Sequence, residues 1–249
     1  MIPDNLNGQT VSLLILAPRG AEAQAIAKGL GKSGHIHLQP MPAGVNGVQS
    51  FLENLGRTWS EQNKPQALLV MGVTGSLSPH YGIGQMVWVE ECQFWRDGNN
   101  SEQKYVGDRR LMEQINQLLG NQWEIPLVKG ITVSQVVCRG EEKRLLGQQS
   151  AAEVVDMENT AVLAFGAKMQ IPVAIVRVVS DTVDQDLPDL SKAFDAQGVL
   201  QPLPLAKALL SRPLAGGHLI SGSLRACGQL TKIARSLSQA GDGVGKALG

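Results

Sequence analysis

Short runs of consecutive apolar residues alternate with amphipathic segments along most of this chain. Residues 11–17 and 67–72 have the length and apolar density of buried strands, and the second run ends on glycine. An Ala-rich segment with a glycine stop follows the first run, and a segment with helical spacing precedes the second. This alternation predicts a mostly parallel sheet with helices on both faces.

The same alternation continues to residue 211. Its pattern predicts a long bent strand at 84–98, a helix at 108–120, a strand at 127–138, a helix at 141–149, a strand–helix–strand unit at 154–181 and a helix at 202–211. A polar turn at 97–101 is typical of an exposed hairpin tip. No internal repeat or low-complexity linker interrupts the pattern, so we expect a single α/β domain with a mixed, mostly parallel sheet.

The composition changes after Arg212, which divides the chain into residues 1–212 and a tail of residues 213–249. From Arg212 onward, five Lys and Arg residues stand against one acid, and apolar positions form a partial helical stripe. We interpret this tail as a basic amphipathic helix that packs on the domain or on a neighbouring subunit. Contact with a membrane surface is the second interpretation, although the tail lacks Trp and Phe anchors.

Charge and cysteine content narrow the class of protein. The chain has 22 basic and 22 acidic residues, so its balance gives no reason to expect a nucleic-acid partner. Three widely spaced cysteines without a CxxC motif are typical of reduced thiols. The first ten residues show no secretory signal and no apolar run approaches membrane-helix length, so we expect a cytoplasmic protein.

Acidic residues stand at the ends of predicted strands, where a buried core is expected to begin or end. Asp156 and Glu158 follow one strand of the 154–181 unit, and Asp181 ends the other. The first strand leads to Arg19 and Glu22 in the same way. Because ligands of parallel α/β sheets bind beyond the carboxyl ends of the strands, these side chains are candidates for a site at one edge.

Each of these features also has an ordinary structural explanation. A glutamate in the first turn of a helix favours the helix dipole, which alone accounts for Glu22. An aspartate at a strand end, such as Asp181, is commonly an N-cap, and a glycine-rich turn is often only a turn. His35 and His37 share one face of a strand but lack a third ligand nearby, so we expect no metal site.

The segment VVDMENTAVLAFGAKMQIPVAIVRVVSD resembles the signature region of the purine nucleoside phosphorylase/nucleosidase superfamily. That family has a DME turn into a helix of small residues, followed by a strand that ends in R-x-(I/V)-S-D. This chain carries the two motifs as Asp156-Met157-Glu158 and as Arg177 through Ser180 to Asp181. The resemblance extends over about residues 10–212 and implies a fold of the nucleoside phosphorylase type.

Three branches of the family are similar to this chain: methylthioadenosine/S-adenosylhomocysteine nucleosidases, futalosine hydrolases and hopanoid-associated phosphorylases. The long basic tail resembles the last branch. The resemblance implies an enzyme that cleaves the N-ribosidic bond of a purine nucleoside or nucleoside-like substrate, without a metal or organic cofactor. It also implies a homo-oligomer.

Roles for single residues follow from the resemblance. Asp181 is expected to protonate the leaving base, and Glu22 to orient or deprotonate an attacking water. Glu158 is expected to bind the ribose hydroxyls, with Met157 against the sugar face. The pocket of the nucleophile, water or phosphate, is expected to include Arg19, Gly72, Val73, Thr74 and Gly75, and the base pocket Val136, Val137 and Ser180.

Departures from the family pattern leave the nucleophile and the substrate open. The strand before Gly72 has no arginine of the kind that holds phosphate in many phosphorolytic relatives, which favours water. Phosphate as co-substrate remains the alternative, including a hopanoid-linked phosphorolysis. Val73 and Ser76 differ from the usual residues of methylthioadenosine nucleosidases, so that substrate is not assigned. A nucleoside-binding module without catalysis is the third interpretation.

Overall fold

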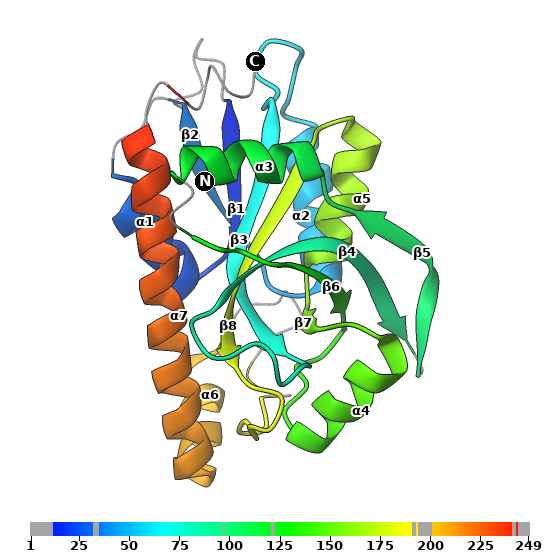
Figure 1. Cartoon of the computed structure of the whole chain (residues 1–249), viewed down its shortest axis with the longest axis vertical. Coiled ribbons are helices and arrows are strands. Elements are labelled where there is room, and N and C mark those ends of the chain that lie inside the picture. Colours follow the sequence, from blue (N-terminus) through cyan, green and yellow to red (C-terminus); the bar gives the residue numbers. More distant parts are fainter. Residues whose placement is uncertain are drawn as a thin grey trace.

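The computed structural model of the chain describes residues 12–31, 35–96, 98–120, 123–190, 193, 201–240 and 243. Within them, eight strands form one mixed sheet (Figure 1). The strands are β1 (Leu13–Pro18), β2 (Ile36–Met41), β3 (Ala67–Ser76), β4 (Met86–Arg96), β5 (Asn99–Val106), β6 (Leu127–Thr132), β7 (Val154–Asp156) and β8 (Val173–Asp181). The prediction of an α/β fold with a mixed, mostly parallel sheet is confirmed.

The sheet closes on itself at its centre. Strand β3 pairs in parallel with β8, and β8 pairs antiparallel with β4. Strands β6 and β7 continue the ring, because β4 pairs with β6, β6 with β7, and β7 with the end of β3. Strands β1 and β2 extend the sheet beyond β3, and β5 forms a hairpin with β4.

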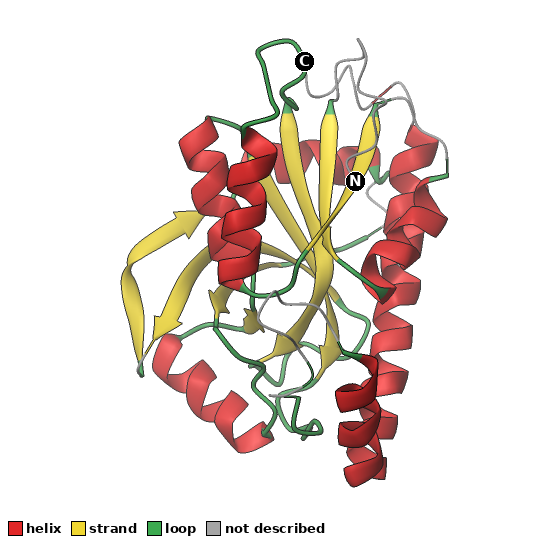
Figure 2. Cartoon of the chain, turned by 180° about the vertical axis from the view of Figure 1, so that it is seen from behind, coloured by secondary structure: helices red, strands yellow, loops and turns green. Residues whose placement is uncertain are grey.

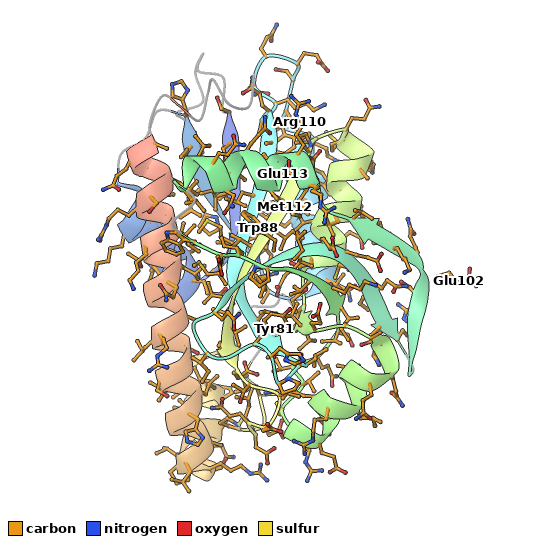
Figure 3. The ribbon with its side chains drawn as sticks, in the orientation of Figure 1. Tyr81, Trp88, Glu102, Arg110, Met112 and Glu113 are labelled. Carbon is orange, nitrogen blue, oxygen red and sulfur yellow. The ribbon has the colours of Figure 1, made fainter. Side chains whose placement is uncertain are left out.

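Seven helices are described: α1 (Ala21–Leu30), α2 (Val45–Gly56), α3 (Arg109–Leu118), α4 (Gly140–Ser150), α5 (Asn159–Met169), α6 (Pro202–Ser211) and α7 (Pro213–Ala240). Helices α1, α3 and α7 cover one face of the sheet, and α2 and α5 cover the other (Figures 1 and 2). Because helices lie on both faces, every residue of β8 is buried. Figure 3 shows Trp88 and Met112 among the side chains under α3, whereas Glu102 extends outward from β5.

Helix α7 begins at Pro213, where the composition changes, and it packs on the domain itself. Its buried side chains, Ala226, Leu230, Ile233, Ala234 and Leu237, belong to the same apolar cluster as α1 and β3. A Cβ atom on Gly29 of α1 would collide with Ala234, so glycine lets the two helices approach closely. None of the described helices is long and apolar enough to cross a bilayer.

Two predicted element boundaries were wrong. Strand β3 does not end at Gly72 but continues to Ser76, because β8 runs beside it as far as Asp181. The residues from Gly72 to Gly75 are therefore strand with a bulge between Thr74 and Gly75, and not the predicted turn. Strand β6 ends at Thr132 instead of 138, and Asp97 of the predicted hairpin tip lies outside the described residues.

The ends of β3, β7 and β8 meet at the lower end of the sheet in Figure 1. Helix α4 lies beneath this end, and α6 lies beside it. The sheet therefore delivers the sequence motifs that end these strands to one region of the molecule.

Candidate active site

A buried arginine organises the centre of the candidate site. Arg177 lies in the middle of β8 and is fully buried. Its Nη2 donates hydrogen bonds of 3.1 Å to Glu158 Oε2 and of 2.6 Å to Asn159 Oδ1. Its Nη1 donates to the backbone carbonyl of Val73 at 3.3 Å. The guanidinium thus joins β8, the end of β3 and the start of α5 into one polar network.

Burial disfavours the charged guanidinium, but nearby carboxylates outweigh that effect. The charges of Asp156, Glu158 and Glu22 raise the pKa of Arg177 above its usual value. A buried cation with several acidic neighbours holds them at fixed positions. The arginine is therefore the shared counter-ion of these three carboxyl groups, which we call the acidic cluster.

Asp156 anchors the DME turn instead of facing a ligand. Its Oδ1 accepts hydrogen bonds from the backbone N–H groups of Glu158 and Asn159, both at 2.7 Å, and from Thr132 Oγ1 at 3.0 Å. Burial raises the pKa of Asp156 to about 6, with Glu158 adding to the rise and Arg177 opposing it. These bonds fix the entry to α5 and thereby the position of Glu158.

Glu158 stands between the arginine and a backbone amide from another part of the chain. Its Oε1 accepts a hydrogen bond of 3.2 Å from the N–H of Gly44, while Oε2 faces Arg177. Met157 lies beside the same backbone, because a Cβ on Gly44 would stand 3.9 Å from its Cε. The predicted ribose-binding pair, Met157 and Glu158, thus lies against the loop before α2.

Glu22 reaches the same network from α1. Its Oε2 accepts a hydrogen bond of 2.7 Å from the N–H of Val73. Burial raises the pKa of this carboxyl group from 4.5 to about 7, while Arg177 and the Val73 amide act in the opposite direction. A Cβ on Gly72 would collide with Arg177 and with Glu22, so glycine provides their space. A carboxyl group with a pKa near 7 suits a general base.

Asp181 lies at the end of β8 with both carboxylate oxygens bonded. Ser180 Oγ donates to its Oδ1 at 2.8 Å, and Lys143 Nζ donates to its Oδ2 at 2.5 Å. A Cβ on Gly75 would stand 3.1 Å from Oδ2, which places the carboxylate against the bulge of β3. Ser180 and Asp181 are therefore adjacent both to each other and to the end of β3.

An open hollow of about 590 Å³ lies between the β4–β5 hairpin and α4. Val45, Phe94, Val133 and Val137 are among its lining residues. Val137 and Met157 pack against the same apolar cluster, which contains Val133 and Val155. The structure thus brings Val137, a predicted base-pocket residue, to the side of the site where Met157 lies. Val136 is partly buried beside it.

Three residues predicted for the pocket of the nucleophile have other partners in the structure. Arg19 is exposed, and its guanidinium lies over the ring of Phe51 at 5.9 Å, toward α2. Thr74 turns its hydroxyl to β7, where it donates to the carbonyl of Val155 at 2.8 Å. The amide of Val73 is occupied by Glu22 and is not the free donor that a turn would offer.

Sequence reasoning missed the partners of the predicted acids. Arg177 carried a visible signal, because a charged residue inside an otherwise apolar strand requires a buried counter-ion. Lys143 and Gly44 carried none, since a lysine in a helix and a glycine in a loop are common. No group of three or more His, Cys, Asp or Glu side chains in the described part of the chain is arranged to hold a metal ion.

Comparison with known proteins decides the family. The family model described as the phosphorylase superfamily matches residues 48–211, well over half of the 249 residues. This chain belongs to the phosphorylase superfamily. The matched range includes the DME turn and all of β8, but it leaves out Glu22 and α7. Among curated proteins, none matches this superfamily member significantly.

Solved structures share the fold of this phosphorylase-superfamily chain at low sequence identity. A futalosine hydrolase from Helicobacter pylori has a TM-score of 0.66 and 14% identity over 92% of this chain and 98% of its own. A 5′-methylthioadenosine/S-adenosylhomocysteine nucleosidase from the same organism has a TM-score of 0.67, with the same identity and coverage. A putative nucleosidase of that kind from Francisella philomiragia has a TM-score of 0.66 and 18% identity over 92% and 99%.

Proposed function

We propose that this protein hydrolyses the N-ribosidic bond of a purine nucleoside or nucleoside-like substrate. The observation that carries the proposal is the convergence of three carboxylates on the end of β3. Glu22 bonds the Val73 amide, Glu158 bonds Arg177, and Asp181 lies against Gly75. The nucleosidase and futalosine hydrolase structures named above have the same fold and support this reaction class.

The chemistry assigns a different task to each carboxylate. Breaking the bond between C1′ and N9 leaves positive charge on the ribosyl ring and negative charge on the purine. Asp181 delivers a proton to the base, which takes the electron pair of the broken bond. Glu158 accepts hydrogen bonds from the ribose hydroxyls and stabilises the cationic ring, and Met157 packs against the sugar.

Water is the nucleophile that the surroundings of Glu22 favour. Its carboxylate accepts a hydrogen bond from the Val73 N–H, which is the donor that a phosphate ion would otherwise use. An ionised carboxylate at this point repels a phosphate anion, whereas it accepts a proton from water. Arg19, the basic residue predicted for this pocket, lies over Phe51. We therefore place water, and not phosphate, beside Glu22.

The remaining features of the proposal concern cofactor, assembly and location. Side chains supply the acid, the base and the hydroxyl contacts, so the proposed reaction needs no cofactor. We also propose a homo-oligomer, because Leu203, Leu210 and Leu214 are each more than four-fifths exposed and suit contact with a second copy. A cytoplasmic location is proposed from the three widely spaced cysteines, which are typical of reduced thiols. Light scattering tests the assembly, and binding of the protein to anionic lipid vesicles would instead favour membrane contact.

The proposed activity is tested by incubating the protein with adenosine, inosine, methylthioadenosine and adenosylhomocysteine and measuring free base. We expect base release from at least one substrate. The Asp181→Asn variant, which keeps the shape of the side chain, should lose activity by about 10² or more. Nucleoside binding without any base release would instead support the non-catalytic binding module.

A further inference from the structure

A buried lysine stands directly behind the proposed acid. Lys143 comes from α4, and its side chain is 1% exposed, against 7% for Asp181. Its Nζ lies 2.5 Å from Asp181 Oδ2. It also donates to the backbone carbonyls of Thr182 at 3.1 Å and Gln185 at 2.9 Å. These three acceptors use all three N–H groups of the ammonium, so Lys143 is held as a fixed cation.

The packing of α4 fixes this lysine in place. The N–H of Gly140 donates to Asp186 Oδ1 at 2.8 Å, and the N–H of Leu187 donates to the carbonyl of Cys138 at 2.7 Å. A Cβ on Gly140 would stand 3.0 Å from the backbone of Asp184. The start of α4 is therefore tied to the segment that follows Asp181, and Lys143 cannot swing away without breaking these contacts.

The contacts of Asp181 bear on the source of the proton that the leaving base needs. Asp181 receives hydrogen bonds on both oxygens, one from the Ser180 hydroxyl and one from the Lys143 ammonium. Both bonds are donated to Asp181, so its two oxygens act as acceptors in this arrangement. A carboxylate has no proton to give, whereas the ammonium at 2.5 Å does.

We propose that Lys143 is the proton source for the leaving base and that it acts through Asp181. This inference rests on the proposed nucleosidase function. As the bond between C1′ and N9 breaks and its electron pair moves into the purine, Asp181 passes a proton to the base and takes one from Lys143. Water forms the new bond to C1′ and gives its proton to Glu22. The neutral amine then regains a proton from solvent, and Glu22 releases one.

The charge of Lys143 acts on two further ionisable groups. They are the Cys138 thiol, just before α4, and the Asp186 carboxylate in the segment that follows β8. Glu142 and Asp189 influence the same thiol. Neither Cys138 nor Asp186 bonds Asp181 among the described contacts. Of the two side chains that do, the Lys143 ammonium is a far stronger acid than the neutral Ser180 hydroxyl, so the lysine is the donor that can supply the proton.

The test compares two leaving groups in the Lys143→Met variant. A purine nucleoside needs a proton on its base, whereas the nitrophenolate of p-nitrophenyl β-D-riboside leaves without one. We expect base release from the nucleoside to fall by about 10²–10⁴, with the release of nitrophenolate nearly unchanged. An equal loss on both substrates would overturn the proposal. Lys232→Met, at an exposed position on α7, is the matched control.

A second comparison keeps the proposal testable if the riboside is not a substrate. The double variant Lys143→Met/Asp181→Asn should lose no more activity than Asp181→Asn alone, because the two residues act as one unit. Independent, multiplying losses would overturn the relay.

Failure of the proposed function has a different signature from failure of the relay. It appears in the wild type, as an absence of base release from every nucleoside offered. Failure of the relay appears only in the variants, while the wild type remains active. The two results are therefore separable with one set of proteins.

Discussion

Arg177 Nη2 donates a hydrogen bond of 3.1 Å to Glu158 Oε2, and both side chains are buried. This contact joins the middle of β8 to the N-cap residue of α5, so it links the two halves of the family signature. The same guanidinium also reaches the end of β3 through Val73. We conclude that this buried cation holds Asp156 and Glu158 of the DME turn against the middle of β8.

Replacing Arg177 with methionine should destabilise the protein strongly. The change leaves Glu158 and Asp156 buried without their counter-ion, which typically costs about 3–5 kcal/mol. Urea unfolding measures the difference. Arg235→Met, at an exposed position on α7, should stay within about 0.5 kcal/mol of the wild type. Similar effects for both variants would mean that Arg177 is not the centre of the network.

Replacing Glu22 with glutamine should remove the proposed general base. We expect kcat to fall by about 10² or more. Because the pKa of Glu22 is about 7, wild-type kcat should rise as pH increases through 7, when the carboxylate becomes ionised. The glutamine variant should lack this rise. A rise of unchanged shape in the variant would assign the titration to another group.

The same carboxyl group predicts a pH dependence of stability. Its pKa is raised from 4.5 to about 7, so between these values the folded protein holds the proton more tightly than the unfolded chain. The free energy of unfolding should therefore fall as pH rises through this window. Since Glu22→Gln cannot ionise, its stability relative to the wild type should increase over the window, by a few kcal/mol at most. Urea unfolding at pH 5 and 7.5 provides the comparison.

Adding a methyl group at Gly75 should disturb Asp181 directly. The new Cβ would stand 3.1 Å from Asp181 Oδ2 and from Val155 Cγ1, so these neighbours must shift. We expect a loss of about 1–3 kcal/mol in stability and a lower kcat. Gly228→Ala is the control, because nothing lies within 4 Å of its new Cβ. In the middle of α7 it should stabilise the protein by about 0.5–1 kcal/mol.

Shortening a buried leucine of α7 tests whether this helix belongs to the domain. Leu230 is fully buried against α1 and the sheet, so Leu230→Ala should cost about 2–5 kcal/mol. Leu224 is 69% exposed on the same helix, and Leu224→Ala should cost less than about 0.5 kcal/mol. Equal, small effects would mean that α7 contributes little to folding.

The sequence predicted the elements well because apolar periodicity is a local property. The strand–helix–strand unit from Val154 to Asp181 has the predicted order, and α6 has the predicted bounds. The end of β3 was not predictable in this way. Glycine usually stops a strand, but Gly72 and Gly75 lie inside β3 to make room for Arg177 and Asp181. The sequence alone does not show these contacts, because they form only when the chain folds.

The acidic residues of the candidate site stand out in the sequence, but its buried lysine does not. Glu158 and Asp181 stand at strand ends, which marks them in the sequence, and Glu22 follows the first strand. Lys143 looks like any surface lysine of a helix, and nothing in EEKRLL shows that it is buried. Its role depends on how α4 packs against Asp181, which is a tertiary contact between residues 38 positions apart.

The central claim is that this protein transfers a ribosyl group from a purine to water. The most direct test is to identify the sugar product formed from a cleaved nucleoside in the presence and absence of phosphate. We predict free sugar at the same rate in both reactions, because the proposed mechanism has Glu22, which accepts the Val73 N–H, activate water. Formation of a sugar 1-phosphate, with base release that requires phosphate, would contradict the account.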